Sequence, residues 1–210
     1  DTDARNNLYR AFVYAVSDGA WGVQLVFDNK VILGTRARKT RTKSFNAFSS
    51  IDYPETAVFR DMRLIPFLRR PDPMPPVQFY GQLDPAVFVL RLVPGMRADI
   101  IPLLAPHYRA LVVESFGVGG LPGGEHGEMY ARLQDWCTSG RLAVFTTQVP
   151  HEGCDLAVYE VGRSVKELPG VLEAKDMTPE AVAVKLMWAL GQTTDRAEAM
   201  RLFTTPVEWD

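Results

Sequence analysis

This chain has few cysteines and histidines, no long apolar run and little net charge. Its 210 residues hold two cysteines and three histidines and carry a formal net charge of −2. With only Cys137 and Cys154, we expect no disulfide framework, and a cytoplasmic location is favoured. The weak charge gives no broad footprint for nucleic acid, and no apolar run approaches the ~20 residues of a membrane span. These absences leave an ordinary globular chain that does not act on nucleic acid or in a membrane.

Metal sites are also poorly supported. Two short segments, residues 125–128 and 151–155, gather ligand-type side chains, but neither has His or Cys pairs at the spacing that zinc requires. We interpret both as polar loops and expect no metal. Nor can a Ser-His-Asp or Cys-His set be assembled, because no histidine sits beside an obvious nucleophile.

The most informative stretch is residues 108–148, where two apolar runs flank a glycine loop and an amphipathic segment. The runs 110–113 and 142–145 are short and uncharged, which is typical of strands buried on both faces of a parallel sheet. Residues 117–124 contain five glycines, and the segment from about 125 to 138 has apolar residues at helical spacing. The stretch therefore predicts a βαβ unit.

A glycine loop after a strand also raises the possibility of a dinucleotide site. Gly117 and Gly119 match the first two glycines of G-x-G-x-x-G, but Pro122 occupies the third position. The second strand runs into Thr146, Thr147 and Gln148, where an acidic residue would be needed to bind a ribose. We therefore expect no nucleotide cofactor, and no other cofactor.

The remaining segments predict two domains. Asp3 is expected to cap a first helix. Residues 23–33 are expected to form a hairpin or one strand with a sharp corner, and short strands at 57–60 and 63–68 follow. The run 36–43 carries five cations and is expected to be a solvated basic loop, anchored by Phe45 and Phe48. Four prolines in residues 69–76 suggest a linker, so we predict domains at 1–68 and 78–210 joined by residues 69–77.

The second domain is expected to begin β, α, β, α, β, which implies a parallel sheet with right-handed crossovers. After it we predict a helix over 158–168, a buried helix that opens with the Thr178 cap and ends at Gly191, and a last helix over 195–203.

Several segments, taken together, resemble the bacterial-type L-asparaginases, in particular the cytoplasmic type I and archaeal-like branch. In the order of the chain these are TDARNNL at 2–8, GTRARK at 34–39, FNAF at 45–48, ESFGVGG at 114–120, TTQ at 146–148, YEVG at 159–162, DMTPE at 176–180 and KLMWAL at 185–190. The resemblance implies an α/β fold: the remnant of an N-terminal catalytic α/β domain, then a smaller flavodoxin-like α/β domain with a parallel sheet.

The resemblance also implies a reaction, in which a threonine nucleophile hydrolyses the side-chain amide of L-asparagine through an acyl-enzyme, with no cofactor. The lysine of the family's Arg-x-x-Lys segment falls on Lys39, which is implied to be a catalytic proton relay. Asp3 and Asn7 are implied to support the site, and Gly117, Gly119 and Gly120 to form a loop at a subunit interface. The implied assembly is a homodimer or a dimer of dimers.

The sequence departs from the family in its nucleophile segments. Neither the Thr-Gly-Gly-Thr nor the Gly-Thr-Asp-Thr segment occurs, and residue 1 is not Met, so we expect upstream residues and expect the 210 residues alone to be inactive. Gly120 stands where many members have an Asn that reaches the neighbouring subunit, and Val149 where the allosteric branch has a Cys. Two alternatives stay open: the asparaginase-like subunit of the glutamyl-tRNA amidotransferase, and a non-catalytic binding or dimerisation module.

Overall fold

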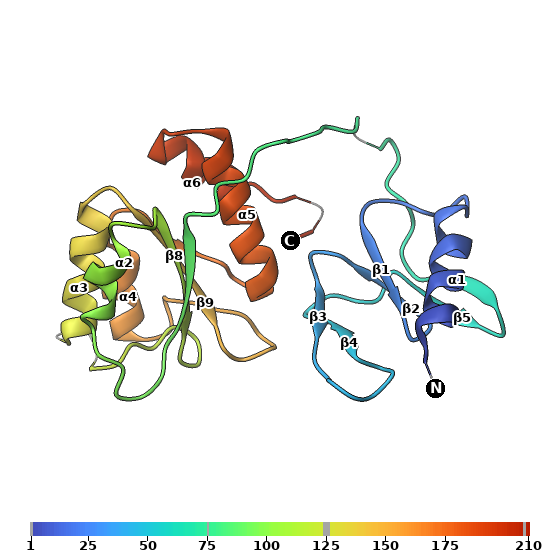
Figure 1. The fold of residues 1–210 in the computed structure, drawn as a ribbon, viewed down its shortest axis with the longest axis horizontal. Coiled ribbons are helices and arrows are strands. Elements are labelled where there is room, and N and C mark those ends of the chain that lie inside the picture. Colours follow the sequence, from blue (N-terminus) through green and yellow to red (C-terminus); the bar gives the residue numbers. More distant parts are fainter. Residues whose placement is uncertain (1, 75, 124–126, 208) are drawn as a thin grey trace. The chain divides into compact units, whose positions relative to one another are not determined.

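The computed structural model describes residues 2–74, 76–123, 127–207 and 209–210. Two compact units divide the chain: residues 1–79 with Trp209 form unit 1, and residues 80–208 with Asp210 form unit 2. Figure 1 shows the elements of each unit. Among the described residues, no helix combines the length and the apolar character that crossing a bilayer would need.

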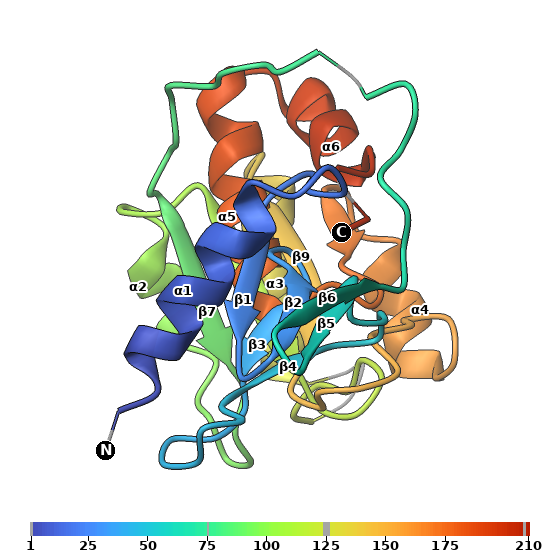
Figure 2. The same ribbon diagram turned by 90° about the vertical axis from the view of Figure 1, so that its right-hand side faces the viewer.

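The described residues of unit 1 form one helix and two antiparallel sheets. The larger sheet has the order β1-β2-β5-β6, and the smaller one pairs β3 with β4. The elements are α1 (Ala4–Ala15), β1 (Gln24–Phe27), β2 (Lys30–Leu33), β3 (Ala37–Lys39), β4 (Phe48–Ser50), β5 (Ala57–Arg60) and β6 (Arg63–Pro66). Helix α1 lies along β1 (Figure 2) and buries Tyr14 against Val31, Ala57 and Phe59.

The predicted hairpin and the strand pair after it are confirmed. Asp28 and Asn29 turn the chain between β1 and β2 with φ of 46° and 66°, the left-handed backbone that a two-residue hairpin of this kind needs. Strands β5 and β6 pair around a similar turn at Asp61 and Met62.

The basic run departs from the prediction of a loop. Residues 37–39 form β3, which pairs with β4 so that Lys39 lies opposite Phe48. The sequence analysis missed this strand because the basic run does not show the alternation of apolar and polar residues that is typical of strands. Phe48 does anchor the segment, since its ring packs on Phe27 with centroids 5.0 Å apart, but the expectation for Phe45 was wrong, because its side chain is 55% exposed.

Unit 2 is a three-layer structure around a parallel sheet with the order β10-β9-β8-β7. The strands are β7 (Val87–Arg91), β8 (Ala110–Ser115), β9 (Leu142–Thr147) and β10 (Val171–Glu173). The helices are α2 (Ile100–Leu104), α3 (Glu128–Thr138), α4 (Glu160–Lys166), α5 (Pro179–Gln192) and α6 (Arg196–Thr204). The strand order follows the chain without a reversal, so successive right-handed crossovers place α2, α3 and α4 on one face. Helices α5 and α6 cover the other face (Figure 1).

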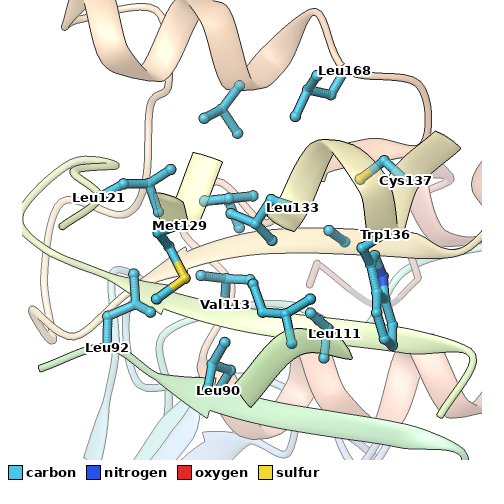
Figure 3. Packing of buried hydrophobic residues seen from close by; sticks show 14 of the residues in the cluster. Leu90, Leu92, Leu111, Val113, Leu121, Met129, Leu133, Trp136, Cys137 and Leu168 are labelled. Carbon is cyan, nitrogen blue, oxygen red and sulfur yellow. The ribbon is translucent and has the colours of Figure 1, made fainter. Parts of the chain in front are cut away.

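Alternate residues of the central strands supply the two cores. Leu111 and Val113 pack toward α3, whereas Ala110 and Val112 pack toward α5 and α6. Figure 3 shows the first core, where Met129, Leu133 and Trp136 of α3 lie over the sheet. All six residues of β8 and all six of β9 are buried. This confirms the prediction for 110–113 and 142–145, and the burial extends to Glu114 and Ser115 and to Thr146 and Thr147, which the prediction did not include.

Two details of the helices correct the sequence analysis. Helix α5 does not end at Gly191 but continues to Gln192; a Cβ at Gly191 would lie 2.7 Å from the carbonyl oxygen of Gln82, so this glycine permits close packing. Asp3 does occupy the N-cap position of α1, but its side chain makes no capping hydrogen bond. The predicted start of α3 at residue 125 lies outside the described residues.

Candidate active site

Lys39, the predicted catalytic residue, lies at the end of β3. Its ammonium group is 5.9 Å from the centroid of the Phe48 ring, a distance at which the ring face attracts a cation. The side chain is exposed, and no carboxylate of a described residue lies within salt-bridge distance of it. A cation that is accessible and has no carboxylate partner among the described residues of unit 1 is chemically suited to meet an acidic group that arrives from elsewhere.

Asp3 and Asn7 form a small network at the start of α1. The Asn7 amide donates from Nδ2 to Oδ2 of Asp3 (2.9 Å), and its Oδ1 accepts from the backbone N–H of Asp28 (3.1 Å). Asn7 is buried, so it fixes the start of the helix against the β1–β2 turn. The geometry gives both residues a supporting structural role in unit 1.

Arg36 is a residue that the sequence analysis did not single out. Its side chain is buried despite its charge, and its guanidinium lies 5.5 Å from the centre of the Tyr53 ring. Its backbone oxygen accepts from the N–H of Ile51, which extends the β3–β4 pairing by one step. The basic run therefore divides into the buried Arg36, the half-buried Arg38, and three exposed cations, Lys39, Arg41 and Lys43.

The glycine loop lies in unit 2, at the carboxyl end of β8. Gly117 and Gly119 have φ of 49° and 149°, and Gly120 closes the loop by pairing with Phe116. A Cβ at Gly119 would lie 2.6 Å from Cδ2 of Leu156, so only glycine fits there without a shift. Residues 124–126, at the far end of the glycine stretch, lie outside the described residues.

Polar groups at the ends of β8 and β9 hold this loop in place. The Thr147 hydroxyl donates to the carbonyl oxygen of Gly117, and the carbonyl oxygen of Val118 accepts from both the Asp155 N–H (3.0 Å) and the Cys154 thiol (3.3 Å). The Gln148 amide donates to the carbonyl oxygen of Leu92 (2.6 Å), which belongs to the edge of the sheet. The loop is therefore tied to the strand ends on both sides.

The two cysteines are buried free thiols. Burial raises the pKa of Cys137 to about 11 and that of Cys154 to about 12. Neither can be a thiolate nucleophile near neutral pH. Among the described residues there is also no group of three or more His, Cys, Asp or Glu side chains that could hold a metal ion; His126 is not described.

Comparisons with known proteins cover both units. The model of the N-terminal asparaginase domain matches residues 1–70, and that of the glutaminase/asparaginase C-terminal domain matches residues 86–203. An L-asparaginase of Thermococcus kodakarensis is 35% identical over 206 residues, which are 96% of this chain and 60% of the relative. A subunit of the glutamyl-tRNA(Gln) amidotransferase of Metallosphaera sedula is 35% identical over 82% of this chain and 39% of that protein.

Solved structures agree with these relatives. The thermostable L-asparaginase from T. kodakarensis superposes with a TM-score of 0.91 at 34% identity, over all of this chain and 62% of that one. L-asparaginase I from Vibrio cholerae gives a TM-score of 0.85 at 26% identity, over 98% of this chain and 62% of that one. The chain thus spans about three fifths of the L-asparaginase relatives. By its sequence and its fold it belongs to the asparaginase family.

Proposed function

We propose that this chain is part of a cytoplasmic L-asparaginase that hydrolyses L-asparagine to L-aspartate and ammonia without a cofactor. The observation that carries the proposal is the agreement of both domains, in order, with L-asparaginases in sequence and in fold. The threonine nucleophile would come from residues outside these 210, because neither nucleophile segment of the family occurs in them. The 210 residues alone would then be inactive.

An uncovered apolar surface on unit 1 supports the proposal that further chain packs there. Leu8, Phe12 and Val16 share one face of the first helix and are 60%, 66% and 83% exposed. Beside the helix lies a hollow of about 450 Å³ whose lining includes Ala11 and Trp21. Apolar surface of this kind is normally covered in the complete protein. Chain that carries the nucleophile would cover it.

Within this proposal Lys39 moves the proton that the nucleophile loses. A threonine hydroxyl has a high pKa and needs a base to attack an amide at neutral pH. A lysine next to a carboxylate can supply that base as a relay, and Lys39 has no such partner among the described residues of unit 1. Like the threonine, the carboxylate would come from outside these 210 residues.

The test is ammonia release by the complete gene product carrying Lys39→Ala. We expect kcat to fall at least about a hundredfold. Folding should be unchanged, because the exposed Lys39 side chain contacts little besides the Phe48 ring. Lys43→Ala is the matched control, since Lys43 is an exposed lysine of the same basic run outside the paired strands, and it should retain full activity. A Lys39→Ala enzyme with normal turnover would remove the catalytic assignment.

The glycine loop is proposed to contribute to an interface in a homodimer or a dimer of dimers. Its rigid attachment to the strand ends supports this role, because a preorganised surface loses little entropy on association. Sedimentation of the complete protein would test it. A monomer at micromolar concentration would exclude a stable dimer.

A second candidate is the asparaginase-like subunit of a glutamyl-tRNA amidotransferase, favoured by the similarity to several such subunits from archaea. Such a protein would act on glutamine and need a partner subunit. Asparagine and glutamine hydrolysis by the purified complete protein distinguish the two: activity on asparagine without a partner supports the asparaginase. No activity on either, with or without proteins that co-purify, would favour the non-catalytic module.

A further inference from the structure

A basic cavity lies at the amino ends of β8 and β9, opposite the glycine loop. Its volume is about 380 Å³, a size typical of sites for small ligands. Three connections enclose it: residues 105–109 before β8, residues 139–142 before β9, and the segment between α5 and α6. Arg109 and Arg141 come from the first two connections, and Arg196 is the first residue of α6.

Only one of these three arginines has a carboxylate partner among the described residues. Arg109 donates from Nη1 to Oδ2 of Asp84 at 2.6 Å. No carboxylate of a described residue lies within salt-bridge distance of Arg141 or Arg196. Two guanidinium charges therefore line the cavity without a neutralising group in the described part of the chain.

Arg141 is held rigidly in its place. Its Nη2 donates to the carbonyl oxygen of Ala105 (2.8 Å), its Nε to that of Tyr108 (3.3 Å), and its guanidinium lies 5.2 Å from the centre of the Trp136 ring. These contacts fix the group but do not cancel its charge. An anion that enters the cavity would meet a donor that is already oriented.

The Arg196 guanidinium occupies space that Gly170 leaves open by having no side chain. The guanidinium lies so close to Gly170 that a Cβ at that position would overlap it. Gly170 has φ of 80° and precedes β10. Asp195 precedes Arg196 in the chain, and its Oδ1 caps α6 by accepting from the Glu198 N–H at 2.7 Å. This hydrogen bond does not neutralise the carboxylate, but Asp195, like the other described carboxylates, forms no salt bridge with Arg196.

We propose that this cavity binds a small, multiply charged anion of the phosphate class, such as inorganic phosphate or a phosphate ester. Guanidinium groups match phosphate oxygens with paired hydrogen bonds, and a bound dianion would neutralise both Arg141 and Arg196. Exposed His107 lies at the same cavity and can add a further N–H donor. The site is independent of the proposed amide hydrolysis, so it can be tested whether or not the chain is catalytic.

The experiment is calorimetric titration of the 210-residue chain with inorganic phosphate and with pyrophosphate, against sodium chloride of equal ionic strength. We expect saturable binding of both anions, tighter for pyrophosphate, and none of chloride. Arg196→Gln should weaken binding about tenfold or more, since a charge-assisted contact is lost. Arg201→Gln is the matched control: it lies on the same helix, pairs with Glu198 and does not line the cavity, so its affinity should be unchanged.

A second measurement needs no variant. Phosphate should shift the backbone amide NMR signals of Gly140 and Thr194, which line the cavity, and leave that of Gly119 in place. Absence of saturable phosphate binding, or equal affinity in wild type and a folded Arg196→Gln, would overturn the proposal. So would binding of malonate without phosphate, because the cavity would then serve carboxylates.

Discussion

Lys185→Met should destabilise unit 2 by removing one half of its buried ion pair. The Lys185 ammonium lies 2.9 Å from each carboxylate oxygen of Asp210, and the two side chains are 8% and 5% exposed. Nζ also donates to the carbonyl oxygen of Thr205 (2.8 Å) and lies 5.6 Å from the centre of the Phe203 ring. Methionine preserves the stem and its packing against α6, so the change isolates the charge.

The expected magnitude follows from what remains after the substitution. Removing one partner of a buried pair costs about 3–5 kcal/mol, because the other charge is left without compensation. Asp210 keeps one hydrogen bond, from the backbone N–H of Val207 (2.9 Å), and it follows helix α6 in an irregular segment that can turn toward water. We therefore expect a loss of about 2–4 kcal/mol.

Hydrogen exchange of the amides of β8 and β9 is the suitable assay, because it reports the opening free energy of unit 2 alone. Lys166→Met is the control: Lys166 pairs with Glu173 at 2.7 Å, but the ammonium is exposed, so its loss should have a far smaller effect. The double variant Lys185→Met/Asp210→Asn should be less destabilised than the sum of the two single variants. Additive effects, or wild-type exchange in Lys185→Met, would refute the argument.

The remaining predictions concern the glycine loop and the thiols. Gly119→Ala should lower the free energy of unfolding by about 2–4 kcal/mol in urea titrations, because it adds a clash with Leu156 to backbone strain. Gly140→Ala is the control: φ is 90° there but the space is open, so this variant should lose less stability. Equal losses of stability in the two variants would exclude the clash as a cause. Cys137 and Cys154 should make the fold less stable as the pH rises above about 9, because the unfolded thiols then release protons that the buried ones, with pKa values of about 11 and about 12, retain. The slope should approach about 3 kcal/mol per pH unit between pH 9 and 11 and disappear in the Cys137→Ala/Cys154→Ala variant. A variant that keeps the full slope would show that other groups cause it.

The sheet and the later helices of unit 2 could be predicted because each has a local signal. The runs 110–113 and 142–145 are uncharged, and burial on both faces of a parallel sheet requires that. Thr178 accepts a capping hydrogen bond at the start of α5, as predicted, and Asp195, the predicted start of the last helix, accepts one at the start of α6. Asp3 has the same signal and does not cap, because its carboxylate accepts from the Asn7 side chain instead.

Features that depend on distant segments could not be predicted. The three arginines of the basic cavity are separated by 32 and 55 residues, and only the parallel topology brings them together. The glycine at position 191 predicted a helix end, but in the structure it lets α5 pack closely against the backbone of Gln82. Lys39 was assigned its proposed role through the family resemblance, because an exposed lysine in a basic run carries no local signal of catalysis.

The two ends of the parallel sheet in unit 2 differ in the partners that they can bind. Open α/β sheets usually bind ligands at the carboxyl ends of their strands. Here the polar groups at those ends are used within the protein: the Ser115 hydroxyl donates to the carbonyl oxygen of Thr146 (2.8 Å), Thr147 holds Gly117, and the Gln148 amide also binds the carbonyl oxygen of Glu114 (2.9 Å). A strand end whose groups are satisfied in this way suits a rigid contact surface. The amino ends keep charged donors available around a cavity, so small anions should be bound there and protein contacts made at the glycine loop.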